Sequence, residues 1–355
     1  MSERNGVIRV AVASVICAAV FVAFGIEVLF GTAVASELVL QDAELQSGTV
    51  SAQPSNEAPP ETVSSVSSSS ASSETNSTKQ ESQSVAVSTG GKVLGAVKER
   101  FITPYTANTS YGKVYLKNST DLDIDIKSLL SDSLPYKIEK NGEPQVLIMH
   151  THTTESFLLE DKDSYTSADA SRSQNPKQNM VALGEKVASI LNAAGINTVH
   201  DKTVHDYPEY NGSYTRSAAT VKKQLKAHPS IKVVIDMHRD AIAGDGSDKV
   251  KPVVEINGKK AAQVMLVMGS QNGTVKNHPD WKENLKLAVR LQQQLESSYP
   301  TLARALSLMP RLYNQNLTTG SILLEMGTEA NSFDEVMYSA ELVGNALVKT
   351  LSALK

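Results

Sequence analysis

Two histidines and a glutamate follow directly on an apolar segment in residues 144–157 (PQVLIMHTHTTESF). The residues VLIM at 146–149 are all large and apolar, which is typical of a buried strand. His150 and His152 follow this run, and Glu155 comes three residues after His152. Catalytic zinc is bound by His nitrogen and carboxylate oxygen, with one position left for water. His152 and Glu155 are close enough in sequence to supply two such ligands from one turn.

The same pattern recurs twice later in the chain. Residues 231–240 (IKVVIDMHRD) and 321–328 (SILLEMGT) are apolar segments that carry His238 and Glu325 near their ends. In an open α/β sheet, binding sites form beyond the carboxyl ends of the strands. We therefore expect three strands to bring His/Glu, His and Glu to one edge. A single His or Glu at a strand end is most often a surface residue, but a Glu after two buried leucines needs a partner.

Composition narrows the kind of site that the chain can hold. The 355 residues have a formal net charge of −4 and no long basic segment, so nothing points to nucleic acid. The single cysteine, Cys17, excludes a disulfide within the chain and a thiolate zinc site. Any metal must therefore be held by His, Asp or Glu.

The elements that must position this edge alternate between helix and strand from residue 144 onward. Gly195 follows the first helical pattern as a typical terminator, and Ser-Phe-Asp-Glu at 332–335 is a capping box before the last one. The alternation predicts an α/β fold in which a mainly parallel sheet has helices on both faces. The expected helices are 179–194, 215–227, 281–298 and 332–351, and the expected strands are 146–149, 196–199, 231–237, 264–268 and 322–324.

The N-terminal residues 1–40 form a targeting segment. Arg4 and Arg9 precede or enter an apolar stretch at 7–30, whose length suits a single membrane-spanning helix with a cytoplasmic N-terminus. The alternative is a cleaved signal peptide, because Ala-Val-Ala at 33–35 resembles a cleavage site. Either way, we expect the rest of the chain to be extracytoplasmic.

The remaining chain divides by composition. Residues 41–92 are rich in Ser, Thr, Glu and Gln and hold few large apolar residues, which predicts a disordered linker. Residues 93–143 form a segment that leads into the catalytic domain and packs on it, with a strand at 111–116 and a short element at 122–130. Residues 144–355 form the catalytic domain itself.

Three separated motifs resemble those of the stage II sporulation protein P family, in the same order. They are HTHTTESF (150–157), VVIDMHRDA (233–241) and LLEMGTEANS (323–332), and YNGSYTRSAATVKKQL (210–225) also fits. The resemblance implies a membrane-anchored cell-wall hydrolase that acts in engulfment by endospore-forming bacteria, with its catalytic domain in the septal space facing the forespore. It also implies a fold similar to that of zinc-dependent N-acetylmuramoyl-L-alanine amidases.

Site roles follow from the resemblance to these amidases. In them a His after the first strand, a Glu and a second His hold Zn²⁺, and a Glu on the last strand is catalytic. His238 matches the second His and Glu325 the catalytic Glu. His152 is the preferred first ligand because it forms a His-x-x-Glu pair with Glu155, as in zinc carboxypeptidases. His150 is the alternative ligand, or it supports the ligands from behind.

The second ligand is where this sequence departs from the amidase pattern. The amidases place their Glu ligand just before the first long helix, but residues 174–178 contain no acid. Glu155 is therefore the best candidate, ahead of Glu160 and Glu185.

Two residues beside His238 have expected supporting roles. Asp236, on the same strand face, could orient His238 as a hydrogen-bond acceptor. Arg239 could contact a substrate carboxylate as part of the catalytic set, although an ion pair with Asp240 is an equal alternative. The other histidines, His200, His205, His228 and His278, are expected to be solvated, with His205 the best outside candidate for the site.

Three functions remain open on the sequence. The first is a zinc amidase that cuts the N-acetylmuramoyl-L-alanine amide of peptidoglycan, with D,D-endopeptidase cleavage of stem-peptide cross-links as a second use of the site. The second is an endopeptidase or carboxypeptidase alone, and the third is a non-enzymatic anchor for wall machinery. The resemblance also implies a partner, stage II sporulation protein D, within an engulfment complex.

Overall fold

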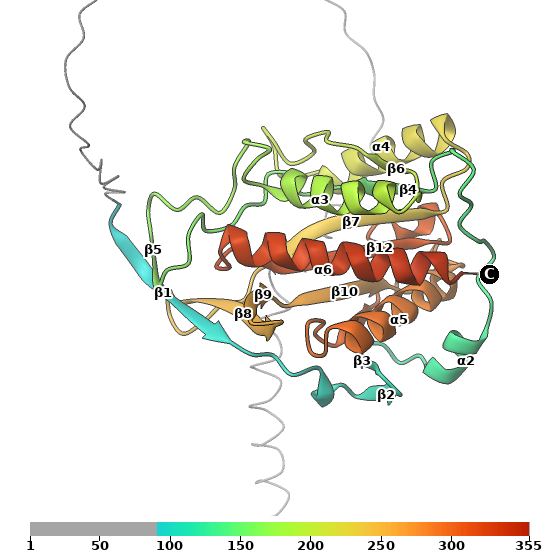
Figure 1. The fold of residues 1–355 in the computed structure, drawn as a ribbon, viewed down its shortest axis with the longest axis horizontal. Helices are drawn as coiled ribbons and strands as arrows, with labels where there is room; N and C mark the ends of the chain where they lie inside the picture. The colour runs from blue at the N-terminus through green and yellow to red at the C-terminus, as the bar shows by residue number, and fades with distance from the viewer. Residues whose placement is uncertain (1–90, 355) are drawn as a thin grey trace, which may run out of the picture.

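The structure is a computed structural model that describes residues 91–354. These residues form two sheets with helices packed around them (Figure 1). The larger sheet has eight strands in the order β2-β3-β11-β10-β12-β7-β4-β6. In that order the strands are β2 (Thr109–Tyr111), β3 (Val114–Asn118), β11 (Leu306–Met309), β10 (Val264–Gly269), β12 (Ser321–Thr328), β7 (Val233–Asp240), β4 (Val146–Met149) and β6 (Thr198–His200).

The prediction of a mainly parallel sheet is wrong, because both sheets are mixed. β6, β4, β7 and β12 run parallel to one another. β10, however, pairs antiparallel with β12, and β2 pairs antiparallel with β3. Two parallel strands must be joined by a crossover connection, which is usually a helix. The chain between β7 and β10 instead forms two strands, β8 and β9, and β10 runs antiparallel to its neighbour β12. The coarser prediction of an α/β fold is confirmed.

The four predicted long helices are present, with bounds close to those expected. Asn179 caps the first of them by accepting a hydrogen bond from the backbone N–H of Val181, and Gly195 follows its end with φ of +76°. The last helix starts with the predicted capping box between Ser332 and Glu335. The helices are α3 (Met180–Ala193), α4 (Ser213–Ala227), α5 (Trp281–Ser298) and α6 (Phe333–Ser352).

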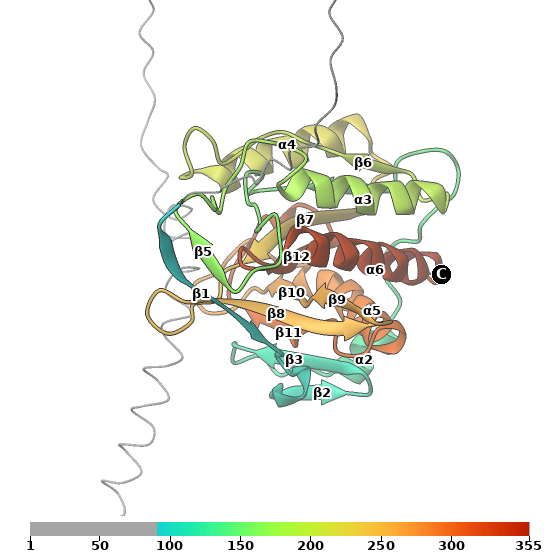
Figure 2. The same ribbon diagram turned by 60° about the vertical axis from the view of Figure 1, so that its left-hand side comes forward.

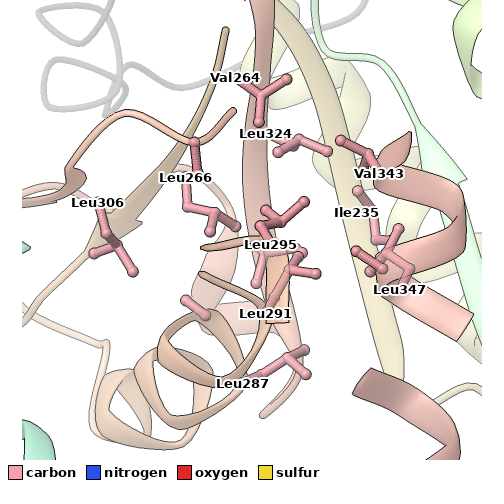
Figure 3. Packing of buried hydrophobic residues seen from close by; sticks show 14 of the residues in the cluster. Ile235, Val264, Leu266, Leu287, Leu291, Leu295, Leu306, Leu324, Val343 and Leu347 are labelled. Carbon is pink, nitrogen blue, oxygen red and sulfur yellow. The ribbon is translucent and has the colours of Figure 1, made fainter. Parts of the chain in front are cut away.

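Alternate residues of the central strands face different helical layers. Ile148, Ile235 and Leu324 belong to the main core, which they share with α3, α5 and α6. Figure 3 shows side chains of α5 and α6 directed at this part of the sheet. Leu147 and Val234 lie on the opposite face and pack with apolar residues of α4. The prediction of helices on both faces is confirmed. Because successive residues of a strand point to opposite faces, the position of a residue along its strand decides which helices its side chain contacts.

The smaller sheet was not predicted. Its order is β5-β1-β8-β9, and Figure 2 shows β1 and β8 side by side. β1 (VLGAVKER) and β9 (KKAA) mix charged with apolar residues without a clear period of two, so neither gives a strand signal. The strands are β1 (Val93–Arg100), β5 (Ser164–Thr166), β8 (Lys249–Ile256) and β9 (Lys259–Ala262).

The segment before residue 144 contributes to both sheets. The single strand predicted at 111–116 is instead the hairpin of β2 and β3, which turns at Gly112 with φ of +59°. The short element expected at 122–130 is α2 (Ile126–Ser131), and two 3-10 turns, η2 (Pro104–Thr106) and η3 (Gln315–Leu317), complete the elements.

The predicted membrane anchor at 1–40 lies outside the described residues, as does nearly all of the linker predicted at 41–92. Within residues 91–354, no helix is long and apolar enough to cross a membrane.

Candidate active site

Strand register places the candidate residues of β7 and β12 next to each other. Glu325 lies opposite His238 in the parallel pair of β12 and β7. His238 continues the alternation of Val234, and Glu325 continues that of Leu323, so both side chains belong to the face that α4 covers. Asp236 shares this face. The strand pairing itself therefore brings a His, an Asp and a Glu to one edge.

His152 and Glu155 join this group from the turn that follows β4. The backbone N–H of Glu155 donates to the carbonyl of His152 over 3.2 Å, which closes the turn. Glu155 Oε2 then lies 3.8 Å from His238 Nδ1 and accepts a hydrogen bond from the backbone N–H of Arg239. The rings of His152 and His238 meet edge to face, with centroids 5.2 Å apart. All three candidate ligands are buried.

His150 lies apart from this group because it continues the parity of Ile148 toward α3. Its Nδ1 is 3.1 Å from the carbonyl of Met237, and its Nε2 is 2.9 Å from Nε2 of His200. Burial, followed by the neighbouring His200, lowers the pKa of His150 to about 3, so the ring is neutral. The structure thus separates the two histidines that the sequence left as rivals and places only His152 beside Glu155.

Asp236 holds His238 from the other side. Its Oδ1 lies 2.9 Å from His238 Nε2 and accepts the backbone N–H of Thr151, while its Oδ2 accepts the Thr151 hydroxyl. Burial alone would lower the pKa of His238, but the charge of Asp236 outweighs it and raises that pKa to about 10. Conversely, burial raises the pKa of Asp236, and His238 overcomes this and brings it to about 2. The two form a buried ion pair when no metal is bound.

Glu325 is the carboxylate that is least satisfied. It is 7% exposed, and its Oε2 has no hydrogen-bond partner among the described residues. Burial, and then the charge of Asp240, raises the pKa of Glu325 to about 8. A carboxyl group whose pKa lies near neutral can both take up and release a proton near pH 7.

Arg239 lies beside the site but is largely engaged by protein groups. Its guanidinium lies 3.6 Å from Glu329 and donates to the carbonyls of Ser171 and Asp240. The Asp240 carboxylate pairs instead with Arg304, 2.8 Å away. The alternative of an Arg239–Asp240 side-chain ion pair is therefore not what the structure shows.

A second layer of residues around the turn was not predicted from the sequence. Asp206 accepts hydrogen bonds from the backbone N–H and hydroxyl of Thr154 and pairs with Arg172 at 2.6 Å. Arg172 also lies 3.8 Å from Glu155 and stacks over the ring of Tyr210. These residues come from loops with no regular spacing, so only folding shows that they meet.

Two histidines expected to be solvated are buried. His205 bonds the carbonyl of His150 through Nδ1 and the Thr220 hydroxyl through Nε2. His278 is fully buried before α5, and neither ring nitrogen has a partner in the part of the chain that the structure describes. Loop position was a poor guide here, because both loops pack into the domain.

The residue types of this group are those that bind zinc, but their side chains do not surround a single position where an ion could lie. Within residues 91–354, no three His, Cys, Asp or Glu side chains stand in an arrangement that could hold a metal. Yet His152 Nδ1 is buried without a partner among these residues, and His152, His238 and Glu155 offer two nitrogens and a carboxylate. These are the ligand types of catalytic zinc sites. A buried nitrogen without a hydrogen-bond partner is a donor that a metal ion could use.

Comparison with known sequences supports the resemblance seen in the motifs. The model of one family, stage II sporulation protein P, matches residues 32–348. The chain belongs to this family. Stage II sporulation protein P of Bacillus subtilis (strain 168) is 29% identical over 217 residues, which cover 58% of this chain and 51% of that protein. The chain thus spans about half the length of this curated relative.

Solved structures that resemble the chain include two amidases. The N-acetylmuramoyl-L-alanine amidase AmiC2 of Nostoc punctiforme is 13% identical, with a TM-score of 0.36, over 59% of this chain and 96% of that one. The CwlD amidase from Clostridioides difficile, solved in complex with the GerS lipoprotein, is 10% identical, with a TM-score of 0.33, over 59% and 94%.

Proposed function

We propose that this family member is a zinc-dependent peptidoglycan hydrolase that cleaves the amide between N-acetylmuramic acid and L-alanine. Stem-peptide cross-links are a second substrate class for the same site, since they are also amides. One observation carries the proposal: buried His152 and Glu155 from the turn after β4 meet His238 of β7 and Glu325 of β12, and several of their polar atoms have no partner among the described residues. A scaffold that only anchors other proteins has no need of such a set.

Each residue has a distinct task in this proposal. His152, Glu155 and His238 would hold the zinc, which supplies a polarised carbonyl and an acidified water. Asp236 orients His238 through its Nε2. Glu325, a buried carboxyl opposite His238 in the paired strand, takes the proton of the attacking water at Oε2 and passes it to the leaving nitrogen. General acid–base groups of this kind contribute about 10² to 10⁴ in rate.

The setting of the enzyme is part of the same proposal. We propose a single-pass membrane protein, held by residues 7–30, whose catalytic domain lies outside the cytoplasm in the septal space during engulfment. Its partner there is stage II sporulation protein D within an engulfment complex. Membership of the family and the composition of the N-terminal segment support this setting.

Analysis of digested peptidoglycan tests the function. Purified protein loaded with zinc is incubated with isolated cell walls, and the products are separated and sequenced by mass spectrometry. Free lactyl groups on the glycan and released stem peptides are expected. Monomeric stem peptides still attached to glycan would assign the endopeptidase alternative instead. No product, from protein that binds one zinc per chain, would favour the non-enzymatic alternative.

A further inference from the structure

The imidazole of His152 is held by a tyrosine that the proposed chemistry does not use. The Tyr210 ring stacks on it, with centroids 4.6 Å apart and planes 11° from parallel. The Tyr210 hydroxyl lies 3.2 Å from His152 Nε2. The other ring nitrogen, Nδ1, is buried and has no partner within the described chain. One nitrogen of His152 is thus occupied and the other is left over.

Tyr210 is itself held in place by residues outside the ligand set. The Arg172 guanidinium lies 4.7 Å from the centre of its ring, and Asp206 fixes that guanidinium by an ion pair. Arg216, on α4, donates to the carbonyls of His205 and Glu209 and so secures the loop that carries Tyr210. These contacts hold the Tyr210 hydroxyl next to His152, and none of them involves His152 itself.

The second histidine also has an oxygen 2.9 Å from its Nε2, although that contact lacks the geometry of a hydrogen bond. His238 has Nε2 next to an oxygen of Asp236, while Nδ1 faces Glu155. A histidine that binds a metal almost always donates its other N–H to an oxygen, which fixes the tautomer and the ring plane. Tyr210 places an oxygen at Nε2 of His152, as Asp236 does at Nε2 of His238, and this oxygen can accept the N–H when Nδ1 binds the metal.

We infer that Tyr210 is the positioning residue that keeps the proton of His152 on Nε2 and so leaves Nδ1 for the zinc. This inference rests on the proposed zinc function. It predicts that removing the Tyr210 hydroxyl weakens zinc binding. If Nε2 bound the metal instead, the Tyr210 hydroxyl would compete with it, and removing the hydroxyl would tighten binding.

Zinc affinity of the full-length chain in detergent, measured by competition with a chelator, tests the inference. Tyr210→Phe keeps the stacked ring and removes only the hydroxyl, so a loss of about 10- to 100-fold in affinity is expected. Tyr207→Phe, three residues away and 54% exposed, is the matched control and should bind as the wild type does. Tyr210→Leu, which also removes the ring, should lose more.

Two further measurements separate positioning from general damage. The melting temperature of metal-free Tyr210→Phe should equal that of the wild type, and cobalt(II) bound in place of zinc should show a shifted visible absorption band. Equal or tighter zinc binding by Tyr210→Phe, with a wild type that binds one zinc, would overturn the inference alone. A wild type that binds no zinc would overturn the proposed function and the inference with it.

Discussion

Two clusters of buried charge in this domain differ in how completely they are satisfied. Lys251 of β8 is 4% exposed and is bonded to Asp161 and to Glu335, the latter at 2.9 Å. The other oxygen of Glu335 accepts from Asn331 and from the backbone of Ser332. Near the C-terminal ends of β7 and β12, in contrast, buried atoms such as His152 Nδ1 and Glu325 Oε2 have no hydrogen-bond partner among the described residues.

The difference separates a structural cluster from a functional one. Leaving a buried donor or acceptor without a hydrogen bond costs about 1–3 kcal/mol, and more if the group is charged. A cluster that only holds the fold together is therefore expected to be complete, as around Lys251. Several incomplete groups at the ends of neighbouring strands fit the proposal that a metal and a substrate complete them.

The largest expected effect is the loss of zinc and of all hydrolysis in His238→Ala. This residue links Glu155 on one side and Asp236 on the other, so its removal also leaves Asp236 buried without its partner. Metal content by elemental analysis and release of wall fragments are measured on one preparation. His228→Ala, at the end of α4, is the control and should keep both. A variant of His238 that still holds one zinc per chain would break the comparison.

Glu325→Gln should keep zinc and lose about 10²- to 10⁴-fold in turnover, because Gln preserves shape but cannot take a proton. The same substitution should raise the stability of the metal-free protein although it lowers turnover. The pKa of Glu325 is raised from 4.5 to about 8, so in metal-free wild type this residue lowers stability increasingly as pH rises across that interval. Metal-free Glu325→Gln should therefore gain more in melting temperature at pH 8 than at pH 5.

The exposed Glu255→Gln on β8 is the control for both readouts and should change neither. If Glu325→Gln loses zinc in proportion to activity, Glu325 is a ligand. Glu155 would then become the candidate proton acceptor.

Lys251→Met tests the satisfied cluster. It leaves Glu335 buried with one oxygen unpaired, and breaking a buried pair costs several kcal/mol. We expect a loss of about 3 kcal/mol in the free energy of unfolding, at the low end of that range because Asp161 is half exposed. Urea denaturation measures the loss, against Lys259→Met as a surface control. Turnover per folded molecule should not change, and a specific loss of turnover would contradict the structural assignment.

The smallest effect is expected at His278, an incomplete group that stands apart from the edge. Burial lowers the pKa of His278 from 6.5 to about 4. The unfolded chain therefore binds an extra proton between these values, and stability is lost as pH falls from 6.5 toward 4. His278→Leu should remove this part of the acid sensitivity and leave hydrolysis at pH 7 unchanged. Reduced hydrolysis at unchanged stability would show that isolated orphan groups also mark function.

The sequence predicted the edge of the site better than its surroundings. Val146–Met149, His238 and Glu325 lie on strands with continuous apolar runs, so the sequence predicted these strands and the reactive residues near their ends, but not how the strands pair. The sequence favoured His152 over His150 only through its spacing to Glu155, because β4 ends at Met149 and the turn after it decides where both side chains point. Asp206 and Tyr210 meet the site only through loop packing, which no local pattern encodes. β1 and β9 were missed because their charges hide the strand alternation.

The order of the strands along the chain has a consequence for how the protein comes into being. β12 lies between β10 and β7, yet it follows both of them in the chain. A nascent polypeptide that has emerged only as far as residue 320 therefore has two strands with a gap between them and lacks Glu325. The proposed active site is therefore incomplete until nearly all of the domain has been synthesised. The unfinished chain meanwhile exposes two sheet edges, which makes this the stage at which a chaperone is most needed.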